Sequence, residues 1–235
     1  MKFRQLTNLL YKLVKYNMKI IFAGKFVWFI LAALAFFFLF AFQSVYNQAE
    51  INEGLIYNLL LFPSVLLVFY PAVFGIQNDE DARTLELLFG IPDYKYKVWG
   101  LRLLMIYIAV FFILLLFSFV AVILLYPVNL FEMSVQLMLP VLFYGNMAFM
   151  LSTMTRSGNG TAVITIIISI VLIIFSNNLE RTFWNILLNP FSVPNNLLPI
   201  IWSEIVMKNR IMLFCCSIIW MMVGLLNLQK REKFI

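Results

Sequence analysis

The sequence contains no histidine and only two cysteines among its 235 residues. Without histidine, the chain cannot form a Ser-His or Cys-His catalytic pair, an HExxH zinc site or a His-ligated haem. Cys215 and Cys216 are neighbours inside an apolar stretch, where a disulfide between them is disfavoured and where they serve as small apolar residues. These absences argue against an enzyme, and we expect no catalytic residue, metal site or bound cofactor in this chain.

Charged residues are also scarce, at 12% of the chain, whereas hydrophobic residues make up 63% and the mean hydropathy is +0.95. A water-soluble domain of this size could not bury so much apolar surface in one core. Six stretches carry no charged side chain, and each is close to the roughly 20 residues that a helix needs to cross a bilayer. The stretches are 26–46, 55–76, 103–126, 135–155, 159–177 and 211–228.

Helices are the expected form of these stretches, because backbone groups in lipid must be satisfied within the segment. The sequence therefore predicts an all-α integral membrane fold with six transmembrane helices. No internal repeat, Gly/Ser linker or low-complexity segment divides the chain, so we expect a single transmembrane domain over residues 1–235.

The spans also lack the groups that would supply energy for transport. Mid-span Asp, Glu, Lys, Arg and His are all missing, although carriers driven by protons or sodium generally use such groups. The chain has no G-x-x-x-x-G-K-[ST] loop for ATP, because Gly24-Lys25-Phe26 lacks the preceding glycine and the following hydroxyl. If this chain moves something across the membrane, the energy must come from a partner.

Most of the positive charge falls in segments that alternate counting places on one side of the membrane. Such segments remain in the cytoplasm, so we expect a multi-pass protein of the cytoplasmic (inner) membrane with both termini in the cytoplasm. The opposite loops, 47–54 and 127–134, contain only glutamates as charged residues. The residues on the basic side are 14 of the 17 Lys and Arg: Lys2, Arg4, Lys12, Lys15, Lys19, Lys25, Arg83, Lys95, Lys97, Arg102, Arg156, Lys230, Arg231 and Lys233.

Residues 3–25 have the pattern of an amphipathic helix. Leucines and isoleucines gather on one face, and a narrow basic arc faces the other way. We expect this helix to lie along the cytoplasmic leaflet with its lysines near anionic head groups. The alternative is a helix packed on a soluble partner. The arc consists of Arg4, Asn8, Lys12, Lys15 and Lys19.

Segment 178–210 is the exception to the charge pattern, because it lies on the outer side by counting and yet holds Arg181, Lys208 and Arg210. Its prolines separate two apolar pieces that are each too short to span. Two short half-helices at the outer interface would satisfy this pattern. An ordinary loop packed on the helix ends would satisfy it equally well.

The segment Gln77–Arg102 combines clustered charge with the signals of a short cytoplasmic helix in a coupling loop over 77–97. Asn78 or Asp79 can cap its start, and Gly90 followed by Pro92 would close it. An apolar ridge follows from the spacing of Leu85, Leu88 and Phe89, as in a helix that docks on a soluble partner. The alternative is a surface helix that only joins its neighbours.

In this segment the chain resembles the permease subunits of type-2 ABC transporters, usually exporters. The resemblance lies in the acidic cluster 79–81, then Thr84-Leu85-Glu86-Leu87-Leu88, then Ile91-Pro92, and then Gly100-Leu101-Arg102. Arg83 stands where the family commonly has glycine, and Arg102 replaces a lysine with a shift of one residue. The amphipathic N-terminal helix, the six spans and the outer segment between spans five and six are also similar to the family.

The resemblance implies a full transporter of two permeases, which form a homodimer or a related heterodimer, and two soluble ATPase subunits that bind ATP and Mg²⁺. A coupling helix of each permease would sit in a cleft of an ATPase. The basic amphipathic segment indicates membrane lipid as a further partner, and we expect no nucleic acid. The implied coupling residues are Asp79, Glu80, Asp81, Arg83, Thr84, Leu85, Glu86, Leu88, Phe89 and Pro92.

We expect the few polar residues inside the spans to form hydrogen bonds between helices. They are Ser64, Ser118, Gln136, Asn146, Thr153, Thr165, Ser169, Ser217 and Asn227. A path without charge suits an apolar or amphipathic cargo, such as a peptide, a lipid-like or a drug-like molecule, better than an inorganic ion; polysaccharide export also occurs in the family. The competing interpretations are a carrier or channel that acts alone and a non-transporting scaffold or immunity protein.

Overall fold

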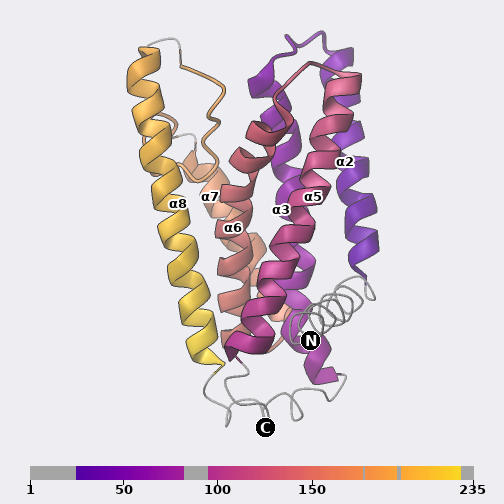
Figure 1. The fold of residues 1–235 in the computed structure, drawn as a ribbon, viewed down its shortest axis with the longest axis vertical. Helices are drawn as coiled ribbons and strands as arrows, with labels where there is room; N and C mark the ends of the chain where they lie inside the picture. The colour runs from indigo at the N-terminus through magenta and orange to yellow at the C-terminus, as the bar shows by residue number, and fades with distance from the viewer. Residues whose placement is uncertain (1–24, 82–94, 177, 195–196, 229–235) are drawn as a thin grey trace, which may run out of the picture.

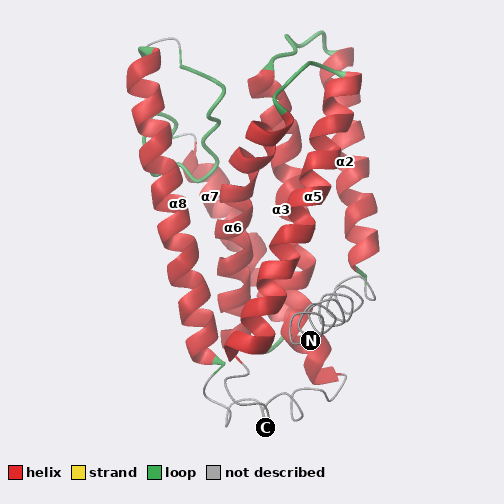
Figure 2. Ribbon diagram, in the orientation of Figure 1, coloured by secondary structure: helices red, strands yellow, loops and turns green. Residues whose placement is uncertain are grey.

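The computed structural model describes residues 25–81, 95–176, 178–194 and 197–228, and within these residues all regular structure is helical (Figures 1 and 2). The predicted amphipathic helix, the core of the predicted coupling loop and the basic tail lie outside the described residues. The described elements are α2 (Phe26–Tyr46), α3 (Glu53–Asp81), the π-helical turn η1 (Lys95–Gly100), α5 (Leu101–Leu124), α6 (Leu130–Thr155), α7 (Gly158–Ser176) and α8 (Pro199–Asn227).

Six of these helices are long and apolar enough to span a membrane, which confirms the predicted all-helical, multi-pass architecture. α2 matches its predicted bounds, and α5 and α7 differ from theirs by one or two residues at each end. Prolines 63, 71 and 140 lie inside α3 and α6. Membrane helices tolerate such prolines, because neighbouring groups satisfy the backbone carbonyls that the missing N–H leaves unpaired.

Helix α6 occupies the centre of the bundle and packs against α3, α5, α7 and α8, while α2 packs on α3 (Figure 1). A continuous core of buried apolar side chains joins α2, α3, α5 and α6. Many large apolar side chains of α2 and α7 are instead exposed, as expected of residues that face lipid. The bundle thus exposes apolar side chains on its periphery, and its central helix α6 contacts four of the other helices.

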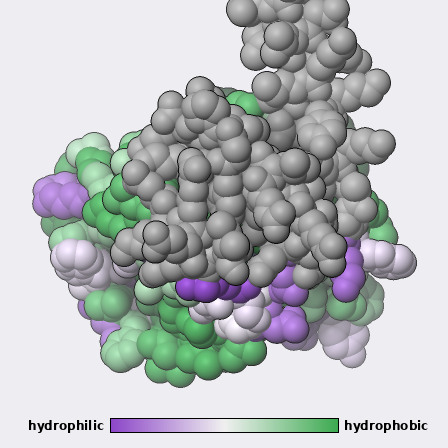
Figure 3. Space-filling view, turned by 90° about the horizontal axis from the view of Figure 1, so that it is seen from below, coloured by the Kyte–Doolittle hydropathy of each residue, from purple (hydrophilic) through white to green (hydrophobic). Residues whose placement is uncertain are grey.

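The helix ends alternate between the two ends of the bundle. The links 47–52, 125–129 and 178–194 lie at one end (top in Figure 1), which we call the outer end after the predicted orientation. The end of α3, the start of α5, the α6–α7 link and the end of α8 lie at the other end, which we call the inner end. Figure 3 faces this second end, with hydrophilic residues visible among the described ones and hydrophobic residues along the sides of the bundle. The predicted orientation assumed that successive links lie alternately at the two ends of the bundle, and the described links do so.

The α6–α7 link is short, and the backbone at its start accounts for its sharp turn. Arg156, which follows α6, adopts the left-handed conformation with φ 57°, and its N–H donates to the Ser152 carbonyl. At the other end of α6, the Asn129 side chain caps the helix by accepting from the Glu132 N–H at 3.3 Å. Both ends of the central helix are therefore defined by local side-chain or backbone geometry.

The sixth span begins twelve residues earlier than predicted, at Pro199 rather than residue 211. Proline at the first turn suits a helix start, because its missing N–H would be unpaired there anyway. Residues 199–210, predicted as part of the outer segment, are helical and continuous with the span. Glu204, Lys208 and Arg210 consequently belong to α8, and the prediction of two half-helices is wrong.

The remaining outer segment, 178–194, forms turns that pack on the helix ends, as in the loop alternative. The Asn189 amide donates to the Gly54 carbonyl at 2.8 Å, and the Trp202 indole donates to the Pro190 carbonyl at 3.2 Å. These hydrogen bonds attach the segment to the start of α3 and to α8.

Helix α3 runs on to Asp81, so Asn78 and Asp79 do not cap the start of a new helix as predicted. Asn78 is committed elsewhere, since its side-chain amide donates to the Tyr70 hydroxyl at 3.2 Å. Gln77 accepts a hydrogen bond from the Gly158 N–H at 2.6 Å, which links α3 to the start of α7. The backbone therefore stays helical through the acidic cluster 79–81.

Candidate functional site

A buried polar network connects three helices in the middle of the bundle. The Tyr107 hydroxyl of α5 donates to Asn146 Oδ1 of α6 at 2.6 Å, and Asn146 Nδ2 donates to the Ser217 hydroxyl of α8 at 2.7 Å. All three side chains are buried. Asn227 donates to Thr153 at 3.4 Å, a second contact between α8 and α6. The predicted role of Asn146, Thr153, Ser217 and Asn227 as interhelical contacts is confirmed, and Tyr107 is a further member that was not predicted.

Other polar residues of the spans act differently. Ser64 and Ser169 hydrogen-bond to carbonyls of their own helices, at 2.6 and 2.8 Å. Buried Thr165 has no partner for its hydroxyl within the described residues. Residue type therefore predicted polar contacts in general, but only some of these side chains connect two helices.

Replacement of Asn146 by leucine is expected to destabilise the bundle by about 1–3 kcal/mol, because Tyr107 and Ser217 would each lose a buried partner. Thermal unfolding in detergent micelles measures the change. Ser169→Ala is the matched control, since Ser169 bonds only within α7. Equal unfolding midpoints for the two variants would show that the network contributes nothing to stability.

The predicted coupling residues begin in the last turn of α3 and continue along the chain into segment 82–94. The backbone of Asp79, Glu80 and Asp81 forms the last turn of α3. Arg83, Thr84, Leu85, Glu86, Leu88, Phe89 and Pro92 lie outside the described residues, as do Arg4, Lys12, Lys15 and Lys19. Segment 82–94 is flanked along the chain by the end of α3 and the start of η1.

Hydrogen bonds fix the helix that enters this segment. The Tyr70 hydroxyl of α3 accepts from the Lys25 N–H at 3.3 Å as well as from Asn78, so it joins the start of α2 to the last turns of α3. In η1, which follows the segment, Trp99 is buried, and the Arg102 Cζ atom lies over its ring at 4.6 Å from the ring centroid. The described helix ends on both sides of segment 82–94 are therefore packed against the bundle.

At the outer end, α8 buries a cation that the sequence analysis placed in the outer segment 178–210, outside the spans. Arg210 is 9% exposed, and its guanidinium Nε donates to Gln136 Oε1 of α6 at 2.7 Å. Nη1 donates to Asn209 Oδ1 at 3.1 Å, and Nη2 donates to the Leu188 carbonyl at 3.3 Å and the Tyr57 hydroxyl at 3.4 Å. All four acceptors are neutral.

Asn209 fixes the outer segment against this cation. Its amide donates to the Phe183 carbonyl at 2.8 Å and the Asn185 carbonyl at 2.7 Å, and the side chain is fully buried. A sequence signal for this part of α8 was present. Glu204 and Lys208 are four residues apart and form an ion pair of 2.6 Å, as on the surface of a helix.

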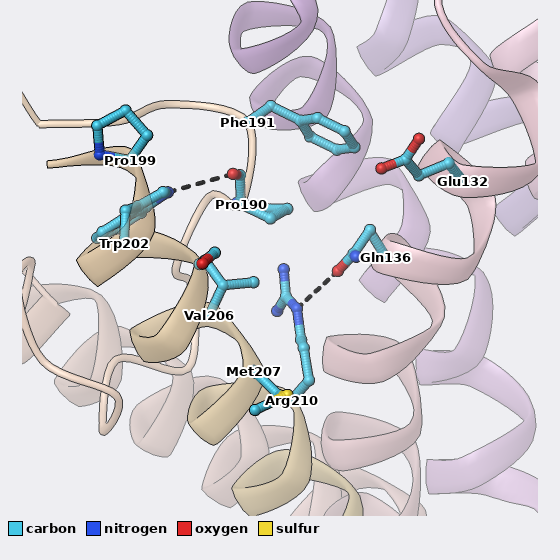
Figure 4. A pocket seen from close by; sticks show the side chains of 10 residues that line it. Glu132, Gln136, Pro190, Phe191, Pro199, Trp202, Val206, Met207 and Arg210 are labelled. Atoms are coloured by element: carbon cyan, nitrogen blue, oxygen red, sulfur yellow. Dashed lines mark hydrogen bonds between the residues drawn. The ribbon is translucent and has the colours of Figure 1, made fainter.

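Arg210 lies at the floor of a cavity of about 410 Å³ between α6, α8 and the outer segment, which we call the outer cavity (Figure 4). Its polar lining also includes Gln136, Ser203 and the carboxylate of Glu132. Within the described residues the guanidinium has no carboxylate within 4.0 Å, and Glu132 likewise has no ion-pair partner. The apolar part of the lining is Pro190, Phe191, Pro199, Trp202, Val206 and Met207.

A second cavity of about 430 Å³ lies between α3, α6 and α7. Its lining is almost entirely apolar, with Phe62, Phe69 and Ile170 among the side chains and Asn58 and Ser169 as the polar exceptions. Such a surface can accommodate acyl chains or other apolar groups and offers little to fix an ion.

The described part of the chain holds no cluster of three or more His, Cys, Asp or Glu side chains that could bind a metal. Comparison with known proteins finds no matching family model, curated protein or solved structure. The function of the two cavities therefore follows only from the residues that line them.

Proposed function

We propose that this chain is the membrane-spanning subunit of an ATP-driven ABC exporter, coupled to a separate ATPase through segment 82–94. The observation that carries the proposal is the acidic cluster 79–81 at the end of α3, followed by the Thr84–Leu88 sequence before the start of η1. Helix α3 has 29 residues and is thus about 44 Å long at 1.5 Å per residue. This exceeds the roughly 30 Å of hydrocarbon, so α3 can carry its acidic end beyond the membrane.

The contacts at the inner end support a mechanical role. A push on segment 82–94 would reach α3 directly, α2 through the Tyr70 hydrogen bonds, and α7 through the Gln77–Gly158 hydrogen bond. From α3 it would reach α6, which packs on four other helices. Closure of an ATP-bound motor could in this way shift several spans together.

The composition of the spans supports an apolar or amphipathic cargo and a separate energy source. Charged residues of α8 lie in its first twelve residues, and the described central parts of the other spans contain none. The full transporter would comprise two copies of this chain or a related pair, two ATPase subunits that bind ATP and Mg²⁺, and surrounding lipid.

A specific observation favours a second candidate, a carrier that works without a motor. Arg210 is a buried ionisable residue inside a spanning helix, and such residues often mark substrate or ion pathways. The two candidates differ in their source of energy. Purification of the chain from its native membrane separates them, because the exporter co-purifies with a soluble ATPase in equal amount and hydrolyses ATP, whereas the carrier does neither.

The proposed orientation predicts which loops face the cytoplasm. In a chain with Cys215 and Cys216 replaced by serine, an impermeant maleimide should label Asn47→Cys in intact cells and should label Ser157→Cys only after permeabilisation. Both positions are exposed, at opposite ends of the bundle. Labelling of Ser157→Cys in intact cells, with Asn47→Cys protected, would reverse the orientation and place segment 82–94 out of reach of ATP.

A further inference from the structure

We propose that the outer cavity binds the head group of a zwitterionic phospholipid, with its phosphate on Arg210 and its ammonium toward Glu132. This inference concerns a binding property of the isolated chain and holds whether or not a motor drives it. It begins from the charge of Arg210, whose burial is costly unless an opposite charge compensates it.

The guanidinium retains capacity to bind an oxyanion. It carries five N–H donors, and the four described acceptors occupy one on Nε, one on Nη1 and both on Nη2. One Nη1–H is left over, and none of the four acceptors carries a charge. A phosphate oxygen in the cavity would accept this N–H and neutralise the cation, and such charge-assisted hydrogen bonds are the strong ones.

The fixed position of Arg210 makes this a formed site. Gln136, Asn209 and Tyr57 each accept a hydrogen bond from the guanidinium, and the Asn209 amide itself donates to two backbone carbonyls. A ligand would therefore meet a cation that is already oriented, with little further loss of side-chain freedom on binding.

Glu132 adds selectivity for a zwitterion. It lies on α6 one turn before Gln136, lines the same cavity and is exposed (Figure 4). Its carboxylate is more than 4.0 Å from any cation of the described chain. A head group with an ammonium beside its phosphate satisfies both charges, whereas a purely anionic head group leaves Glu132 as a repulsive neighbour.

The depth of the cavity favours a lipid as the source of this chemistry. Arg210 precedes Asn227, the last residue of α8, by 17 positions, about 26 Å along the helix. If the end of α8 lies at the inner interface, Arg210 lies near the outer boundary of a hydrocarbon layer of roughly 30 Å, where head groups meet acyl chains. Phe191, Trp202 and Met207 supply the apolar contacts for the start of the chains.

The test uses the purified full-length chain in detergent micelles and a short-chain brominated phosphatidylethanolamine as the probe. Bromine quenches nearby tryptophans, and the Trp202→Phe variant identifies the part of the signal that comes from the cavity. We expect saturable quenching of Trp202. Arg210→Gln should weaken apparent binding by about tenfold or more, since a charge-assisted hydrogen bond is lost.

Lys208→Gln is the matched control, because it removes a cation two residues away on the same helix, at 56% side-chain exposure and outside the cavity. It should leave the binding curve unchanged. Glu132→Gln, an exposed change that spares the core, should reduce the preference for phosphatidylethanolamine over phosphatidylglycerol several-fold. This variant keeps the proposal testable if Arg210→Gln fails to fold.

Identical curves for the unmodified chain, Arg210→Gln and Glu132→Gln would overturn the proposal. So would equal losses in Arg210→Gln and Lys208→Gln, which would indicate general attraction to lipid. Free phosphoethanolamine should compete only at far higher concentration than the lipid. Competition at equal concentration would assign the cavity to a small soluble zwitterion and refute the phospholipid.

Discussion

Leu85→Glu combined with Leu88→Glu is expected to reduce ATP-driven transport in vesicles to background, while the chain still inserts and folds. In a helix over this segment, the two leucines share one face with Phe89. On the proposed function this face fills a groove of the ATPase. Each of the two introduced carboxylates would lose its water on entering an apolar groove. The binding free energy would become less favourable by several kcal/mol, which is enough to abolish docking.

The chain offers a matched control for this double variant. Leu87 lies two residues from Leu85 and one from Leu88, so at about 100° per residue it points away from the ridge. Leu87→Glu introduces the same chemistry on the opposite face and should retain most of the transport activity. Unchanged transport in the double variant, or equal loss in Leu87→Glu, would contradict a docking role for the ridge.

Gly145→Val is expected to produce the largest loss of stability. Gly145 lies in the central helix α6 where α3 and α5 approach closely. A Cβ atom there would come within 2.7 Å of the Val68 Cγ2 methyl and 2.8 Å of the Tyr107 hydroxyl. Both neighbours are buried, and Tyr107 is hydrogen-bonded to Asn146, so neither can move without loss of packing. Overpacking of this kind typically costs about 1–3 kcal/mol, and a two-helix clash belongs at the upper end.

Gly160→Val is the control for the glycine itself. A Cβ atom at Gly160 would meet only Ser157 atoms, at 3.6 and 3.7 Å, which is ordinary contact. Both glycines are helical, so the difference between the two unfolding midpoints in detergent isolates the clash. If the two variants unfold at the same temperature, the close approach of α3, α5 and α6 at Gly145 is wrong.

The length and charge of the spans made most of the fold predictable. Uncharged stretches identified α2, α5 and α7 almost to the residue, because lipid allows few alternatives to an apolar helix. The same rule found the inner part of α8 but misplaced its start, because Glu204, Lys208 and Arg210 interrupt the uncharged stretch. A helix of 29 residues exceeds the hydrocarbon thickness, so its outer turns need not be free of charge.

The sites were less predictable, because they depend on contacts between residues far apart in sequence. Asn146 and Ser217 were recognised as polar residues that would bond between helices, but nothing local indicated that they bond to each other or to Tyr107. Arg210 was placed in the outer segment rather than in a span, and its partner Gln136 is 74 residues away. Local capping signals also misplaced a helix start at Asn78, whose side chain bonds to Tyr70 instead.

Reconstitution in liposomes tests the central claim most directly, namely that a separate nucleotide-hydrolysing motor acts on segment 82–94. The complex purified from its native membrane should take up or release its cargo only with ATP and Mg²⁺, and the same complex with Leu85→Glu and Leu88→Glu should not. If the purified chain alone moves the cargo against its gradient on an ion gradient, with no second protein present, the claim is contradicted.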